Sequence, residues 1–293
     1  MATRHSPTVR LRRLSRELRQ LRETAGLTVT EAARAAGWNQ SNLSRAENRL
    51  WRQPNLAHLG RLLDVYGITE TAQPKRRTEL LQLAREGRRR GWWADYTISD
   101  AYSTYVGLEA EADTVRNYEP GVVPGLLQTP AYARALIATR APDLTAEQVD
   151  ELVELRVERQ ERLLSVPDPI HVSAVLAEET LRRAVGGTDV MIEQLDHLHK
   201  VAQLPHVRLQ VLPFAAGAAP AAGPFSILSF IEPRDPEAVY VETPAGDLWQ
   251  EDPARVTEFL RSWERLIAAA RSTADTLILI EARVNYLRVK GRP

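Results

Sequence analysis

The first seventy residues carry apolar side chains at the spacing of short helices. Four leucines share one helical stripe: Leu11, Leu14, Leu18 and Leu21. Arginines fill most of the positions off this stripe. Gly26 is expected to end the helix, because glycine readily adopts the left-handed conformation of a helix C-cap. The pattern therefore predicts a first helix with one buried face and one basic face.

Two shorter helices follow, and capping residues mark their ends. Thr28 and Glu31 have the spacing of a capping box, which predicts a second helix that Gly37 ends. Asn39 can cap a third helix over residues 40–47. Two short helices joined by a glycine-containing turn are typical of a helix-turn-helix.

The rest of the chain mixes helical periodicity with β-rich runs. Helices are expected over residues 55–66, 80–87, 104–120, 130–137, 151–164, 178–185, 190–202, 253–272 and 274–287. Strands are expected over Ile170–Leu176, Val207–Phe214, Phe225–Ile231 and Ala238–Thr243. The order predicts an α+β protein. Its parts are an all-α helix-turn-helix domain (1–72), a helical linker (73–98) and a larger α+β domain with a small β-sheet (99–293).

Charge divides the chain in nearly the same place. Residues 1–90 carry 19 Lys and Arg against 8 Asp and Glu, a net charge of +11, and the remainder carries 19 against 30, a net charge of −11. This asymmetry favours a nucleic-acid-binding N-terminal part, and the alternative is a chance clustering of arginines on solvated faces. The chain has no cysteine, no signal-peptide pattern and no apolar run of membrane-spanning length, so we expect a cytoplasmic, nucleoid-associated protein with no membrane contact.

Residues 11–67 resemble the Cro/repressor type of helix-turn-helix domain, the Xre family. The matching positions are an alanine, the turn glycine, an apolar residue and a polar run: Ala33, Gly37, Leu43 and QSNLSRAEN. The resemblance implies binding to double-stranded DNA, with residues 40–47 as the recognition helix. The family commonly has a phosphate-binding glutamine where this chain has Val29. Phosphate contact would then fall to the start of that helix, at Thr28, where backbone amides can face an anion.

The outer face of the predicted recognition helix offers polar side chains to DNA. Four residues are candidates for contact with base edges: Gln40, Ser41, Asn42 and Ser44. Three arginines are better suited to phosphates, which position a protein without specifying sequence: Arg45, Arg49 and Arg52. DNA would repel Glu47, and the resemblance implies that Glu47 pairs internally with Arg22 as a structural ion pair.

The second half resembles the C-terminal domain of a large actinobacterial regulator family, some members of which are described as Scr1-type, antitoxin-like regulators. The motifs are "LEAEA", "YEPGVVPGLLQTPAYARAL", "RVERQERLL", "VLAEETLRRAVGG", "VRLQVLPF", "GPF" and "VYVE". Members often pair with small partner proteins, so the resemblance implies a regulatory or partner-binding domain. We place its receiving surface near the loop 215–224 and a segment that contains Pro124, Gly125, Leu126, Gln128 and Tyr132.

Residue patterns for catalysis are weak. No histidine pair has the His-Glu-x-x-His spacing of a zinc peptidase, and the second half has only two lysines for a serine-lysine dyad. Glu109, Glu111 and Asp113 are close in sequence, but this spacing does not place all three on one helix face, so a solvated face is expected rather than a metal site. No phosphate loop or dinucleotide fingerprint is present. We therefore expect no enzyme, no metal and no cofactor.

Two functions from different classes remain. The first is a sequence-specific DNA-binding transcriptional regulator whose second domain forms a homodimer and receives a protein or small-molecule signal. The second is an antitoxin-like interaction protein that sequesters a small cognate partner and binds DNA for autoregulation. A stoichiometric partner that co-purifies with the chain would favour the second.

Overall fold

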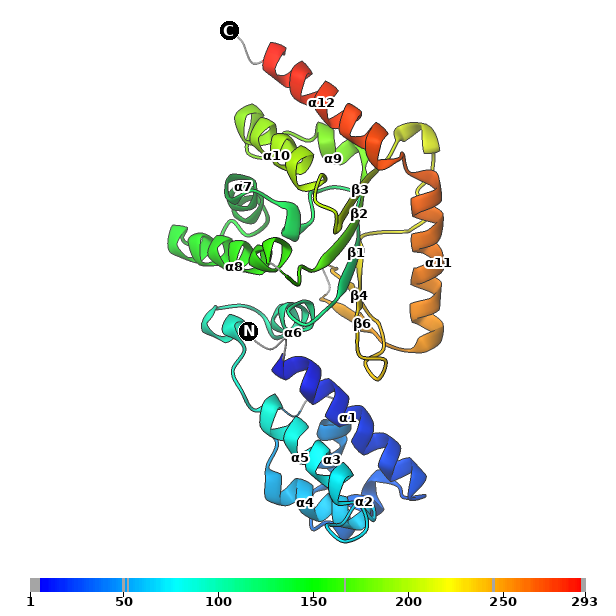
Figure 1. Cartoon of the computed structure of the whole chain (residues 1–293). Coiled ribbons are helices and arrows are strands. Elements are labelled where there is room, and N and C mark those ends of the chain that lie inside the picture. The colour runs from blue at the N-terminus through cyan, green and yellow to red at the C-terminus, as the bar shows by residue number, and fades with distance from the viewer. Residues whose placement is uncertain (1–5, 49–50, 52, 166, 244–245, 291–293) are drawn as a thin grey trace. The chain divides into compact units, whose positions relative to one another are not determined.

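The chain divides into two compact units, Met1–Ala94 and Asp95–Pro293, each with its own hydrophobic core (Figure 1). A computed structural model describes residues 6–48, 51, 53–165, 167–243 and 246–290. None of the helices in these ranges combines the length and the apolar character needed to cross a membrane.

Helices alone build the described part of the first unit. They are α1 (Pro7–Thr24), α2 (Val29–Ala35), α3 (Gln40–Glu47), α4 (Leu56–Val65) and α5 (Pro74–Gly87), and the 3-10 helix η1 (Trp92–Asp95) lies at the division between the units. Leu18 of α1, Leu43 of α3 and Leu62 of α4 are shielded from solvent in one core. The predicted helix-turn-helix is therefore present, with its apolar residues packed inward.

Local capping explains where these helices begin and end. The Thr28–Glu31 capping box is present at the start of α2, and the Asn39 side chain accepts a hydrogen bond at the start of α3. Gly26 and Gly37 have φ values of 68° and 64°, the left-handed conformation expected for them. The sequence-based predictions of these caps and stops are confirmed.

The first unit extends to Ala94, whereas the sequence predicted that the first domain ends at residue 72. Helix α5 lies within the segment expected to be a linker (73–98), yet it packs against α1 and α4. Leu80 and Ala84 of α5 are fully buried in the core of the first unit. A Cβ added to Gly87 would lie 2.5 Å from the Leu11 side chain, so α5 and α1 approach closely there. Helix α5 is thus an integral part of the first unit.

A mixed β-sheet forms the centre of the second unit. Its strands are β1 (Thr114–Glu119), β2 (His171–Ala177), β3 (Val207–Leu212), β4 (Phe225–Ser229), β5 (Ala238–Val241) and β6 (Leu248–Gln250). The described strands lie in the order β3-β2-β1-β4-β5-β6. Strands β1, β2 and β3 are parallel, and β4, β5 and β6 continue the sheet by antiparallel pairing. Strands β1 and β5 therefore point the same way, and their carboxyl ends lie at the same edge of the sheet.

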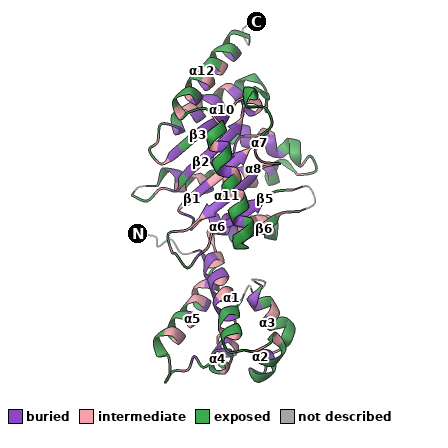
Figure 2. Cartoon of the chain, turned by 90° about the vertical axis from the view of Figure 1, so that its right-hand side faces the viewer, coloured by how far each residue is buried: buried purple, intermediate pink, exposed green. Residues whose placement is uncertain are grey.

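Helices cover both faces of this sheet (Figures 1 and 2). They are α6 (Asp100–Glu109), α7 (Pro130–Arg140), α8 (Ala146–Leu164), α9 (Glu178–Arg182), α10 (Thr188–Val201), α11 (Pro253–Ala269) and α12 (Thr273–Lys290), with the 3-10 helices η2 (Gly125–Leu127) and η3 (Phe214–Ala216). Trp263 and Leu266 of α11 pack against Phe225 and Ile227 on one face. Helices α7, α8 and α10 lie on the other face (Figure 1). The α+β fold class is confirmed.

One sequence-based element was wrong. The helix expected over residues 104–120 ends at Glu109, and residues 114–119 form β1, a central strand. Strand β1 contains polar side chains that are not typical of a buried strand, so the sequence pattern did not indicate it. Asn117 donates to the Ser226 hydroxyl at 2.7 Å, and Arg116 donates to Ser229 and Glu237. These partners are more than one hundred residues away, so local pattern gives no sign of them.

Candidate nucleic-acid interface

The described part of the first unit presents α3 with its polar face outward. Leu43 and Ala46 are fully buried and fix the inner side of the helix. Gln40, Ser41, Asn42 and Arg45 are exposed, and Ser44 is half-buried. The predicted base-contacting residues and one predicted phosphate contact therefore lie together on the accessible side of one helix.

The free side chains on this face are fewer than the sequence suggested. The Ser41 hydroxyl donates to Asn39 Oδ1 at 2.7 Å, and the Asn48 amide donates to Ser44. The side chains of Gln40, Asn42 and Arg45 have no hydrogen-bond partner within the described residues. An unpaired amide on an exposed helix can form the two hydrogen bonds that adenine offers in the major groove. Gln40 and Asn42 are thus the strongest candidates for base contacts.

The N-terminus of α2 does not offer Thr28 freely to a phosphate. The Thr28 hydroxyl donates to Glu31 Oε2 at 2.6 Å, and the Thr28 amide donates to the same oxygen at 2.8 Å. These hydrogen bonds lower the pKa of Glu31, so the carboxylate is ionised at neutral pH. The Thr28 hydroxyl serves the cap, and contact between a phosphate and the start of α2 stays a prediction.

A small hollow beside α3 was not found from the sequence. It has a volume of about 230 Å³ and is lined by Trp38, Asn42, Arg45, Trp51, Asn55 and His58. Trp38 and Trp51 meet edge to face, with ring centroids 5.2 Å apart. The Trp38 indole nitrogen is buried and has no hydrogen-bond partner among the described residues. In the sequence, the feature that could have indicated this hollow is Trp38, which directly follows the turn glycine Gly37.

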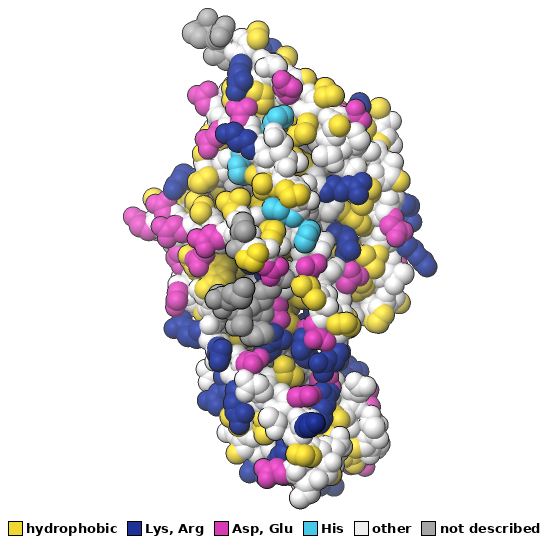
Figure 3. All heavy atoms as spheres, in the orientation of Figure 1, with side chains coloured by type: hydrophobic (Ala, Val, Ile, Leu, Met, Phe, Trp, Pro, Cys, Tyr) yellow, Lys and Arg dark blue, Asp and Glu magenta, His cyan; other side chains and the backbone are white. Residues whose placement is uncertain are grey.

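Basic side chains gather over the first unit on the face shown in Figure 3, and acidic ones gather over α8 of the second. This agrees with the net charges of +11 and −11 of the two parts of the sequence. Positive charge supplies the sequence-independent part of DNA affinity. Arg49 and Arg52, two of the predicted phosphate contacts, lie outside the described residues.

Arg22 of α1 and Glu47 of α3 form a two-pronged ion pair. Arg22 Nε lies 2.8 Å from Glu47 Oε1, and Arg22 Nη2 lies 2.9 Å from Glu47 Oε2. Arg22 also donates to the Leu27 carbonyl oxygen at 2.8 Å. The side chains are only 11% and 4% exposed. The pair therefore ties α1 and the turn to α3, and the Glu47 carboxylate is not exposed.

The predicted partner segment of the second unit is mostly interior. Leu126, Gln128 and Tyr132 are buried. The Gln128 amide donates to the Val123 carbonyl oxygen, and the Tyr132 hydroxyl accepts from the Val123 amide. Pro124 is buried as well, and Gly125 is half-buried. Burial leaves little of this segment for a protein partner to reach, whereas most of the loop 215–224 is exposed or half-buried, and the receiving role of both stays a prediction.

Glu109 also differs from its predicted solvated position. It forms a buried ion pair with Arg159 of α8, with Nε–Oε1 2.7 Å and Nη2–Oε2 2.8 Å. Both side chains are 4% exposed. The Arg159 guanidinium lies over the Tyr105 ring and donates to the Tyr102 hydroxyl. Glu109 therefore anchors α6 to α8, which its position among nearby acids did not reveal.

Comparison with known families agrees with this division of the chain. A family model described as a helix-turn-helix domain matches residues 13–74, and one described as a domain of unknown function (DUF5753) matches residues 102–282. No curated protein and no solved structure gave a match. The first match supports a DNA-binding regulator. The second covers more than half of the chain, so the chain belongs to the family that carries the domain of unknown function DUF5753.

Proposed function

We propose that this protein is a sequence-specific transcriptional regulator of the Xre type that acts at the nucleoid. The observation that carries the proposal is the row of exposed side chains on α3 that have no partner among the described residues: Gln40, Asn42 and Arg45. A capped helix held by the Arg22–Glu47 pair presents this row as a rigid surface. The dimensions of α3 suit the major groove of DNA, which admits one α-helix.

Gln40→Ala tests this assignment on the DNA sequence that the full-length chain selects from a random library. We expect a loss of roughly 1–3 kcal/mol on the selected site and little change on random DNA, because only base contacts specify sequence. Arg45→Ala is the matched variant on the same helix, and it should weaken binding to both DNAs alike. Competition gel shifts give both affinities. Equal losses on both DNAs for Gln40→Ala would remove α3 from base recognition.

We propose further that the second unit forms a homodimer through α12. Four residues on the outer side of this helix share a stripe at spacings of 4, 4 and 3: Ile278, Ala282, Tyr286 and Val289. Ile278 and Val289 are 65% and 74% exposed, which is unusual for large apolar side chains on a packed helix. The partner that fits this stripe is a second copy of the same chain, because α12 carries Asp275 near its start and Lys290 at its end. Antiparallel pairing of two copies would bring these opposite charges together.

The dimer has a direct test in the double variant Ile278→Arg/Val289→Arg. Like charges across a two-fold contact repel, so we expect light scattering to report the mass of one chain, where the unsubstituted protein gives two. Ile231→Arg is the control, because Ile231 is 69% exposed but lies on a loop after β4. A monomeric unsubstituted protein, or a dimer that survives the double substitution, would contradict the α12 interface.

The second candidate function is an antitoxin-like protein that sequesters a small cognate partner. The observation in its favour is the exposed loop 215–224, next to Phe214, whose ring is 56% exposed and lies under Arg182. A stoichiometric partner that co-purifies with the chain and is lost in Phe214→Ser would favour this function. A chain that purifies alone and still selects one DNA sequence would favour the regulator. Neither proposal includes a catalytic step.

A further inference from the structure

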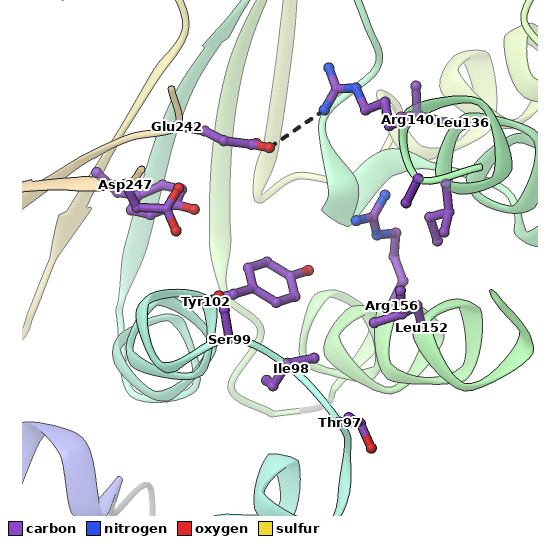
Figure 4. Close-up of a pocket in the computed structure, with 13 residues that line it drawn as sticks. Thr97, Ile98, Ser99, Tyr102, Leu136, Arg140, Leu152, Arg156, Glu242 and Asp247 are labelled. Atoms are coloured by element: carbon purple, nitrogen blue, oxygen red, sulfur yellow. Dashed lines mark hydrogen bonds and ion pairs between the residues drawn. The ribbon is translucent and has the colours of Figure 1, made fainter. Parts of the chain in front are cut away.

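A cavity of about 470 Å³ opens in the second unit between three helices and the sheet. Tyr102 comes from α6, Arg140 from α7, Arg156 from α8 and Tyr240 from β5 (Figure 4). The cavity lies at the carboxyl end of β5, the edge at which β1 also ends. Ligands of sheets with helices on both faces commonly bind at the carboxyl ends of strands. The volume is that of a small-molecule site.

Opposite charges line opposite sides of this cavity. Arg140 and Arg156 project from the helices, and Glu242 and Asp247 lie on the side of the strands (Figure 4). The Arg156 guanidinium is held in place by Gln128, whose Oε1 accepts from Nη1 at 2.7 Å. Arg140 and Glu242 form an ion pair across the cavity, and their nearest atoms are 3.7 Å apart, beyond hydrogen-bond distance (Figure 4). The Arg140 guanidinium therefore keeps hydrogen-bond donors, and the Glu242 carboxylate keeps acceptors, that a ligand can use.

Part of the remaining lining is apolar, and the hydroxyl-bearing Thr97, Ser99 and Tyr102 complete it. Ile98, Leu136, Ile137 and Leu152 provide an aliphatic wall. The Tyr240 ring packs against Tyr105 and Trp249, with centroids 4.7 Å and 5.0 Å away, so its position is set by other aromatic groups. A cavity that combines an apolar wall with convergent polar groups is typical of a small-ligand site.

The two arginines and two carboxylates of the cavity indicate which class of ligand it can bind. A purely anionic ligand would meet Glu242 and Asp247, and a purely cationic one would meet Arg140 and Arg156, so each is disfavoured. A third carboxyl group lies nearby: burial, followed by the negative charge of Glu242, raises the pKa of Glu119 to about 7. A ligand with one charge of each sign satisfies both sides.

We propose that this cavity binds a small zwitterion of the amino-acid or short-peptide class. Its carboxylate faces Arg156 and Arg140, its ammonium group faces Asp247 and Glu242, and an aliphatic side chain lies on Leu136 and Leu152. The proposal rests on the proposed function in one respect, which is that the second unit receives the signal that the regulator transmits.

Calorimetry on the full-length protein with L-leucyl-L-leucine tests the site. Two analogues isolate the charges: N-acetyl-leucyl-leucine lacks the ammonium group, and leucyl-leucine amide lacks the carboxylate. We expect the dipeptide to bind and each analogue to bind at least about tenfold more weakly, because a charge-assisted contact is lost. No heat from the dipeptide up to about 1 mM, or equal binding of the three compounds, would overturn the proposal.

Variants locate the binding and separate it from the DNA role. Glu242→Gln should weaken binding of the dipeptide. This substitution should leave the fold intact, because the Glu242 side chain is 61% exposed. Arg156→Lys should weaken it as well, whereas Arg134→Ala on the same helix as Arg140 is the control outside the cavity. Unchanged binding in both cavity variants overturns the site. Dipeptide binding by a chain that selects no DNA sequence contradicts the proposed function and supports the site, whereas sequence-specific DNA binding without dipeptide binding does the reverse.

Discussion

Replacing Glu109 with alanine should destabilise the second unit by about 3–5 kcal/mol. The Arg159 guanidinium would remain 4% exposed and without its carboxylate. An uncompensated buried charge is far more costly than the loss of an exposed ion pair. Hydrogen exchange of the β1 and β2 amides in the full-length protein reports the stability of this unit by itself.

Two further variants show whether burial is the cause. Glu258→Ala removes one partner of the exposed Arg255–Glu258 pair and should cost less than about 1 kcal/mol. The double variant Glu109→Leu/Arg159→Met removes both charges and should recover most of the loss, because apolar residues of similar volume often replace a buried ion pair at little cost. A Glu109→Ala protein as stable as Glu258→Ala would refute the buried pair.

Glu47→Ala should destabilise the first unit by about 3 kcal/mol and weaken DNA binding together with it. Arg22 would keep only its hydrogen bond to Leu27 and its 3.6 Å contact with the exposed Glu23. Hydrogen exchange of the α1 and α3 amides in the full-length protein measures the change in this unit by itself.

Glu23→Ala is the matched control for Glu47→Ala, because it removes the other carboxylate near the same arginine. Glu23 is 54% exposed, so its loss should cost less than about 1 kcal/mol. A Glu47→Ala protein with unchanged stability and tighter DNA binding would show instead that Glu47 is a surface acid that repels DNA.

The first unit could be predicted from sequence because its determinants are local. The capping box of Thr28 and Glu31, the cap at Asn39 and the positive-φ Gly37 each act within four residues. Such signals fix where helices begin and end, and with them which side of α3 faces outward. Local pattern also predicted the capping role of Thr28, whose hydroxyl donates to Glu31.

The second unit depends on partners that are distant in the chain. Strand β1 pairs with β2, 57 residues later, and with β4, more than one hundred residues later. Glu109 meets Arg159 across 50 residues. Arg140 and Arg156 look like ordinary surface residues of two helices until the fold brings them to one cavity. Periodicity within a segment carries no information about such contacts.

Selection of DNA from a random duplex library by the full-length protein tests the central claim most directly. A regulator that reads sequence through α3 should enrich one motif, bound roughly a thousandfold or more tightly than random DNA at physiological salt. A dimer should enrich it as two half-sites whose centres lie about one helical turn apart. Enrichment of no motif, with selected and starting pools bound equally and with equal salt dependence, would show that this helix-turn-helix does not read DNA sequence.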